Sequence, residues 1–245
     1  MKNKCALGLL LSVFFACFAM VASAGATTYS FTSTEVVAGN PFAWQGALDA
    51  PTAVPMGDKT LSDVTLATTF NYYAAPITPA QFTLTTVGTP ALDPGFVLNA
   101  VPLSTQALGS QDATLAFVVT APTTAPIVDV SLSFVGGILP KAASAASATV
   151  TEFVYTNSAK TTLLGTLTVG ETGLTFIPSA VVNFAPQTSI YVVKDMSVQG
   201  DGAPGAAAFI SQVTQNFSEV PVPPSVLLFA PGLLGLVGMR KRLRG

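Results

Sequence analysis

Histidine is absent from this 245-residue chain, and only 9% of its residues are charged. The chain therefore lacks both the usual general base of protein catalysis and the commonest metal ligand. Its two cysteines, Cys5 and Cys17, both lie in the apolar N-terminal segment, so the rest of the chain can form no internal disulfide. A Ser–His–Asp or Cys–His triad cannot be assembled from these residues.

Basic residues are scarce between residues 25 and 219, where four lysines face all twelve acidic residues of the chain and leave a net charge of about −8. Nucleic acid is therefore excluded as a partner, because its recognition needs clustered Lys and Arg. The four lysines adjoin acidic, loop-forming or hydroxyl residues, so we expect them to be solvated rather than catalytic. They are Lys59, Lys141, Lys160 and Lys194.

The N-terminus has the three parts of a secretory signal peptide. Two lysines in the first four residues precede an apolar stretch from Cys5 to Val21, which ends in Ala22-Ser23-Ala24. We predict a signal helix over residues 1–24, with Ala22 and Ala24 as the small residues that guide cleavage; an uncleaved anchor helix is the alternative. The general secretion machinery and a signal peptidase are the implied partners.

The C-terminus combines a proline motif, an apolar run and a basic end. Val220-Pro221-Val222-Pro223 ends the preceding strand pattern, because proline cannot donate to a sheet. The apolar residues 224–239 predict a short transmembrane helix, and the basic end predicts that the body lies outside the cytoplasm, tethered to the inner membrane. The basic residues are Arg240, Lys241, Arg242 and Arg244.

Residues 220–245 resemble the PEP-CTERM sorting tail of Gram-negative bacteria. The usual family signature is Val-Pro-Glu-Pro, and Val222 stands here in place of the Glu. The resemblance implies processing near the proline motif by an exosortase-type enzyme, after transient tethering to the inner membrane, and then release or attachment at the cell surface. It also implies an association with extracellular polysaccharide and biofilm.

Between these signals, residues 25–219 show the period-two alternation of half-buried strands. The fold class expected is all-β, an antiparallel β-sandwich body flanked by the signal helix and the transmembrane helix. The runs that favour strands are Tyr29–Thr32, Val64–Tyr72, Gln81–Val87, Ala113–Thr120, Val128–Phe134, Thr149–Tyr155, Leu163–Val169, Leu174–Ile177, Ser189–Val198 and Ala208–Phe217.

Three regions are expected to be irregular. Residues 40–60 follow Gly39 and contain Pro41, Pro51 and Pro55, so we predict a long irregular connection there. Val169–Gly173 predicts a turn. Lys141–Ala148 predicts a helical turn or a loop. Along the last strand pattern, we expect Phe209, Val213 and Phe217 to share one face.

Candidate chemistry is limited to oxygen ligands and one tryptophan. Asp195 and Asp201 flank a predicted turn that could bind calcium, although no Asp-x-Asp-x-Asp loop is present. Trp44 is either a sugar-stacking platform or a core filler beside a loop. A glycosidase would need two facing carboxylates, which sequence alone cannot bring together. We expect no cofactor.

The leading interpretation is an exported cell-surface or extracellular-matrix structural protein, sorted by an exosortase-type system and without catalytic activity. A secreted carbohydrate- or calcium-binding module is the first alternative, with extracellular polysaccharide as a candidate partner. A carboxylate-dependent extracellular hydrolase is the second alternative.

Overall fold

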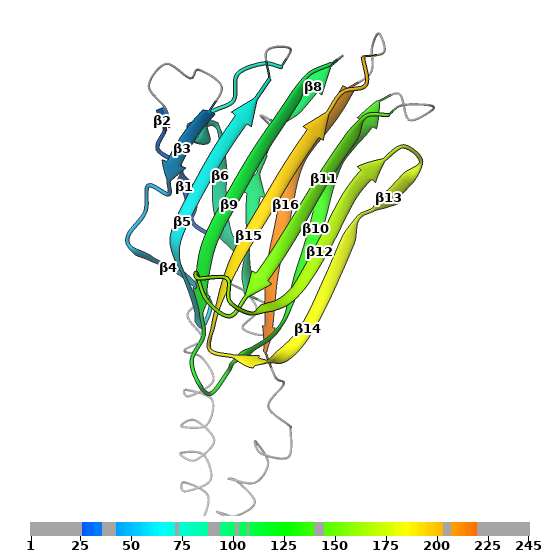
Figure 1. The fold of residues 1–245 in the computed structure, drawn as a ribbon. Coiled ribbons are helices and arrows are strands. Elements are labelled where there is room, and N and C mark those ends of the chain that lie inside the picture. Colours follow the sequence, from blue (N-terminus) through cyan, green and yellow to red (C-terminus); the bar gives the residue numbers. More distant parts are fainter. Residues whose placement is uncertain are drawn as a thin grey trace, which may run out of the picture.

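A computed structural model describes residues 26–35, 43–71, 74–87, 94–100, 103–106, 108–139, 145–202 and 207–219. These residues form two antiparallel sheets that face each other (Figure 1). The expectation of an all-β sandwich body is confirmed. The predicted signal helix and transmembrane helix lie outside the described residues, and within those residues no helix is long and apolar enough to cross a membrane.

The first sheet has seven strands, with β8 paired to β16 beside the main order β1-β6-β7-β16-β10-β14. The bounds are β1 (Thr28–Ser30), β6 (Thr83–Val87), β7 (Gly95–Asn99), β8 (Ser104–Gln106), β10 (Ile127–Leu139), β14 (Ser179–Gln187) and β16 (Ala207–Glu219). The second sheet has nine strands in the order β13-β12-β11-β15-β9-β5-β3-β2, with β4 paired to β5. The bounds are β2 (Thr34–Glu35), β3 (Ala43–Ala47), β4 (Ala53–Met56), β5 (Lys59–Phe70), β9 (Ser110–Thr120), β11 (Ser147–Tyr155), β12 (Leu163–Thr172), β13 (Thr175–Ile177) and β15 (Ser189–Gln199). A short 3-10 helix, η1 (Pro79–Gln81), precedes β6.

Strict alternation of side chains builds the core between the sheets. Every second residue of β9, β11 and β15 is buried, while the residues between them stay partly or fully exposed. Three phenylalanine rings fill the centre: Phe96 meets Phe117 edge to face at 5.2 Å between ring centroids, and Phe217 lies 6.3 Å from Phe117. Such aromatic packing stabilises a core beyond its buried area.

The chain passes from one sheet to the other along one side of the sandwich. Strand β13 is the edge of the nine-stranded sheet, and after Pro178 the chain continues as β14 at the edge of the seven-stranded sheet (Figure 1). The two sheets approach closely there, since a Cβ added at Gly165 of β12 would lie 2.2 Å from Val182 of β14. Glycine at this position permits the close approach.

Several local expectations were wrong. Residues 40–60 hold β3 and β4 rather than one long irregular connection, and Gly170 and Glu171 belong to β12 rather than to a turn. Phe209 does not share the buried face of Val213 and Phe217, because the pairing of β16 with β10 shifts register between them and reverses the alternation.

Candidate functional site

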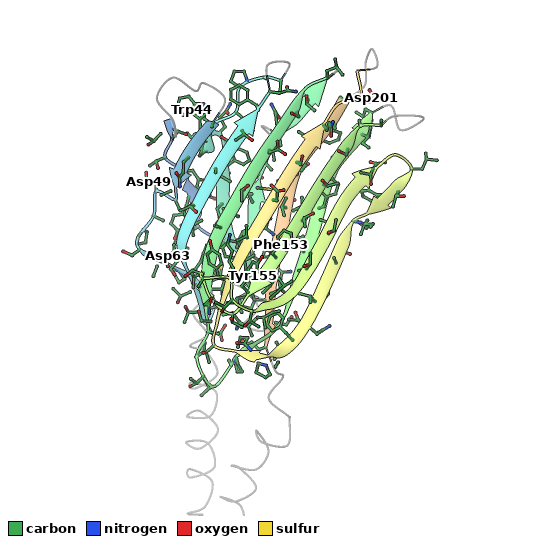
Figure 2. The ribbon with its side chains drawn as sticks, in the orientation of Figure 1. Trp44, Asp49, Asp63, Phe153, Tyr155 and Asp201 are labelled. Carbon is green, nitrogen blue, oxygen red and sulfur yellow. The ribbon has the colours of Figure 1, made fainter. Side chains whose placement is uncertain are left out.

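The outer face of the nine-stranded sheet carries aromatic side chains on two neighbouring strands. Tyr155 of β11 lies directly opposite Tyr191 of β15, and Phe153 lies opposite Val193 two pairs further along, on the same face. All four side chains are partly exposed. We call Phe153, Tyr155 and Tyr191 the aromatic row; Figure 2 shows Phe153 and Tyr155 near the C-terminal end of β11.

Apolar and hydroxyl side chains extend the aromatic row across the sheet. Tyr155 pairs with Leu163 of β12, which is 52% exposed, and Tyr191 pairs with Val118 of β9. No lysine or arginine occupies an outward position of β9, β11 or β15. Around the aromatic row, this face therefore presents flat rings among apolar and hydroxyl groups.

Two carboxylates lie further along the same face. Asp195 of β15 pairs with Thr114 of β9, whose hydroxyl donates to Asp195 Oδ1 at 3.4 Å, and Asp112 lies two residues along β9 from Thr114. Partial desolvation raises the pKa of Asp195, and the negative charge of Asp112 raises it further. Both acids lie on the outward face of paired strands, with Asp112 partly exposed and Asp195 exposed.

A second surface feature lies at the far side of the sheet, around a bulge in β5. Asp63 has a φ of 51°, and the pairing of β5 with β9 shifts register between Ser62 and Thr65. Asp63 lines a hollow of about 210 Å³ together with Thr52, and a second hollow of about 270 Å³ includes Gln45 and shares Thr65 with the first. Among the described residues that line these hollows, Asp63 is the one carboxylate, so the described lining of each lacks the acid pair that a glycosidase needs.

Trp44 is a core filler rather than a platform. It lies on β3 opposite Thr68, which is fully buried, and it packs partly buried against the hydrophobic core. Figure 2 places it at the edge of the sheet, on a different strand from the aromatic row.

The residues singled out for calcium are not brought together around a turn. Asp195 lies inside β15, whereas Asp201 follows the end of that strand. Within the described ranges, no group of three or more His, Cys, Asp or Glu side chains is arranged to hold a metal ion.

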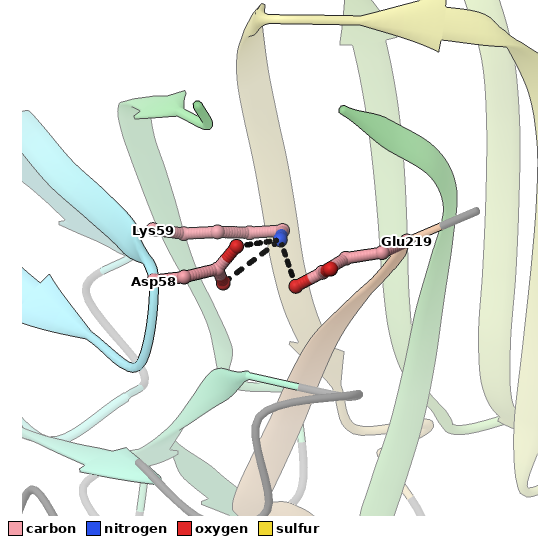
Figure 3. Close-up of polar contacts among 3 residues, drawn as sticks. All are labelled: Asp58, Lys59 and Glu219. Atoms are coloured by element: carbon pink, nitrogen blue, oxygen red, sulfur yellow. Dashed lines mark hydrogen bonds and ion pairs between the residues drawn. The ribbon is translucent and has the colours of Figure 1, made fainter. Parts of the chain in front are cut away.

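The expectation that the lysines are solvated was wrong for two of them. The side chain of Lys59 is fully buried, and its Nζ donates to Asp58 Oδ1 at 3.0 Å and to Glu219 Oε1 at 2.9 Å (Figure 3). Asp58 sits in the tight β4–β5 turn after Gly57, whose φ is 63°. Because β5 and β16 belong to opposite sheets, this cluster ties the last residue of β16 across the sandwich.

Burial raises the pKa of Glu219 and outweighs the opposing effect of its hydrogen bond with Lys59. The carboxylates of this cluster still reach water, with 28% of the Asp58 side chain and 12% of the Glu219 side chain exposed.

Lys194 is the second buried lysine, and it lies in the middle of the core. Its Nζ forms an ion pair with Glu152 Oε2 and donates to Gln215 Oε1, and all three residues are fully buried. Gln215 Nε2 donates to Glu152 Oε1 at 3.2 Å and to the Ser131 carbonyl at 3.0 Å. We call Glu152, Lys194 and Gln215 the buried triad.

The sequence signal for the buried triad is that each of its polar residues occupies a position that the period-two alternation of its strand assigns to the core. Lys194 falls on the face of Val192 and Met196, and the same rule places Glu152 with buried valines and Gln215 with Val213 and Phe217. Lys160, by contrast, is exposed in the β11–β12 connection, and Lys141 lies outside the described residues.

The predicted targeting residues also lie outside the described part of the chain. These are the cleavage residues Ala22 and Ala24, the motif Val220, Pro221, Val222 and Pro223, and the basic residues Arg240, Lys241, Arg242 and Arg244.

No protein-family model matches the sequence, and no curated protein matches it. Among solved structures, a carbohydrate-binding module in complex with β-1,4-galactotriose is 13% identical, with a TM-score of 0.27 over 54% of this chain and 86% of that one. A xylan-binding module from Roseburia intestinalis is 13% identical, with a TM-score of 0.23 over 51% and 78%. A tailspike protein of bacteriophage CBA120 is 16% identical, with a TM-score of 0.29 over 66% and 20%. At these scores the likeness carries no functional inference.

Proposed function

We propose that the sandwich is a non-catalytic module that binds a neutral polysaccharide on the outer face of β11 and β15. The observation that carries this proposal is the aromatic row, Phe153, Tyr155 and Tyr191, which stands partly exposed on adjacent paired strands. This proposal prefers the carbohydrate-binding alternative to the structural role that was the leading interpretation of the sequence.

The physical basis is the two-sided character of a sugar ring. Its C–H face is apolar and packs on the face of an aromatic ring, while its hydroxyls need hydrogen-bond partners at the edge. Tyr155 and Tyr191 supply rings with a phenolic hydroxyl, and neighbouring strands lie roughly 4.8 Å apart, so successive rings can follow an extended chain of sugars.

Charge supports a neutral ligand over an anionic one. The outward positions of β9, β11 and β15 carry Asp112 and Asp195 and no basic residue, so a uronic-acid or sulfated polymer would meet like charge. The carboxylates can instead accept hydrogen bonds from sugar hydroxyls.

The experiment is affinity electrophoresis and calorimetry of the full chain against neutral glucans, galactans and xylans, with an alginate control. Tyr155→Ala combined with Tyr191→Ala should abolish binding of whichever neutral polymer is bound. Tyr29→Ala, a partly exposed tyrosine of the opposite sheet, is the matched control and should bind like wild type. Equal binding by the double variant and the wild type would contradict the proposal.

We also propose that the C-terminal residues deliver this module to the cell surface through exosortase-type sorting after export through the signal peptide. The support is the motif Val220-Pro221-Val222-Pro223 followed by the apolar run and the basic end. Deletion of residues 220–245 followed by cell fractionation is the test. Unchanged surface localisation of the truncated protein would contradict a sorting role.

A structural role in the extracellular matrix is the second candidate. It is favoured by two buried ion clusters that join the sheets, at Lys59 and at Lys194, and by the scarcity of charge. If no polysaccharide binds, while a deletion strain loses matrix cohesion, this second function replaces the first.

A further inference from the structure

The buried triad joins the two sheets at the centre of the core. Glu152 and Lys194 face each other directly in the register of β11 and β15, within the nine-stranded sheet. Gln215 belongs to β16 of the seven-stranded sheet, 21 residues after Lys194. The three side chains therefore meet across the sandwich rather than along one strand.

The surroundings of the triad exclude water. Gln215 lies opposite Phe96 in the register of β16 and β7, and Phe217 follows it on the same buried face. On the other sheet, Leu115 lies opposite Lys194 and is fully buried. Bringing an ammonium and a carboxylate into such a core costs several kcal/mol per ion, so a permanently charged pair is a weak stabilising device.

The hydrogen bonds of the triad orient its atoms for a reaction. The lysine ammonium can only donate hydrogen bonds, and the glutamate carboxylate can only accept them. The Gln215 carboxamide therefore turns its oxygen toward Lys194 and its nitrogen toward Glu152. One oxygen of Glu152 thus contacts the lysine nitrogen, and the other contacts the amide nitrogen. A nucleophile, a proton carrier and a leaving group therefore belong to one hydrogen-bonded cluster.

Burial also favours the reactive form of the lysine. Desolvation lowers the pKa of Lys194 despite the opposing charge of Glu152, so the neutral amine is more accessible than in an exposed lysine.

We propose that the Nζ of Lys194 and the side-chain Cδ of Gln215 become joined by an amide bond, with Glu152 relaying the protons and ammonia as the leaving group. The Lys194 ammonium first gives a proton to the Glu152 carboxylate, and the neutral amine then attacks Cδ. Glu152 passes a proton to Nε2 and takes one from Nζ. The Cδ–Nε2 bond then breaks and the carbonyl re-forms. The ammonia takes the last proton from Glu152, so that an ammonium ion replaces the lysine's charge and no oxidant or reductant is consumed.

The result is a covalent bond between the two sheets. It ties β16, the strand that leads toward the predicted sorting motif at Val220, to β15 at the centre of the nine-stranded sheet. A crosslink between Lys194 and Gln215 would resist unfolding when the chain is pulled from its C-terminal side, because separation of the sheets would then require breaking a covalent bond.

A peptide map of the full-length protein, purified from cells and digested with trypsin under denaturing conditions, tests the proposal. We expect no cleavage after Lys194, because its amine is blocked, so that Lys194 and Gln215 stay in one tryptic peptide that begins at Thr161. This peptide should contain an internal crosslink and be lighter than its linear form by one ammonia molecule. A linear peptide ending at Lys194, together with an unmodified Gln215, would overturn the proposal. The wild-type map decides this point whether or not any variant folds.

Glu152→Gln tests the role of the proton carrier. We expect bond formation to slow by about a hundredfold or more, since general acid–base catalysis contributes at least that much, and freshly made protein then to remain linear. Glu171→Gln is the matched control. Glu171 is a second buried carboxylate, on β12, and it accepts a hydrogen bond from the Ile138 amide. Its replacement should leave the crosslinked peptide unchanged. Full crosslinking in Glu152→Gln would overturn the assigned role of Glu152.

Discussion

The strand pair β11 and β15 shows opposite chemistry on its two faces. Its inner face holds Glu152 and Lys194, an ion pair with no exposure to water, and its outer face holds Phe153, Tyr155 and Tyr191. Adjacent residues of one strand therefore serve different faces: Glu152 points into the core, and Phe153, the next residue, lies on the outer face. Composition alone therefore does not locate function: this strand pair encloses an ion pair and exposes three aromatic rings.

The inner face should show the largest stability effect. Compared with wild-type protein in which Lys194 and Glu152 are still an ion pair and no amide bond has formed, Lys194→Met leaves the Glu152 carboxylate buried without its cation. We expect a loss of about 3–5 kcal/mol in the free energy of unfolding. Combining Lys194→Met with Glu152→Met should recover much of this loss, because both charges are then removed. Denaturant unfolding followed by circular dichroism measures both variants. A loss below about 1 kcal/mol in Lys194→Met would contradict this account of the inner face.

The rim of the core should show an intermediate effect. Lys59→Met removes the cation between Asp58 and Glu219, but both carboxylates keep some contact with water. We expect a loss of about 1–2 kcal/mol, smaller than at Lys194. The same denaturant series measures it. If Lys59→Met destabilises the protein more than Lys194→Met, the expected difference between the partly exposed Lys59 cluster and the fully buried Lys194 cluster is wrong.

The outer face should show an effect on binding and little on folding. Phe153→Ala removes one ring of the aromatic row, and we expect affinity for the bound polysaccharide to fall about fivefold to tenfold, or about 1–1.4 kcal/mol. Its free energy of unfolding should change by about 1 kcal/mol or less, since the side chain is partly exposed. Calorimetric titration and thermal melting of the same sample separate the two quantities.

The smallest effect concerns pH. Asp195 has a raised pKa in the folded protein, so its own contribution to folding stability is fully present below its ordinary pKa of 3.8 and is lost as pH rises through the raised value. Asp195→Asn should therefore melt at a slightly higher temperature than wild type at pH 7 and at the same temperature at pH 3. A lower melting temperature at pH 7 would show that the carboxylate stabilises the fold instead.

Much of the fold follows from period-two alternation, which predicts β5, β9, β10, β11, β15 and β16 at close to their observed positions. Strand β14 gives no such signal, because Asn183 and Pro186 interrupt its apolar residues and it lies at a sheet edge. Strands β3 and β4 also give no clear alternation, because prolines and glycines interrupt their sequence.

The candidate sites were harder to predict because they depend on which strands pair. Tyr155 and Tyr191 are 36 positions apart in the chain and meet only through the register of β11 with β15. Lys194 and Gln215 were detectable in principle, since each occupies a position that alternation assigns to the core. Their meeting, however, depends on how the two sheets are packed, which no local pattern encodes.

Hydroxyl-radical footprinting of the full chain, with and without the bound neutral polysaccharide, tests the proposed function most directly. We predict that the ligand protects Tyr155, Tyr191 and Phe153 from oxidation, while Tyr29 on the opposite sheet stays as reactive as in the free protein. Protection centred on the hollows around Asp63, or none on β11 and β15, would contradict a binding site on the outer face.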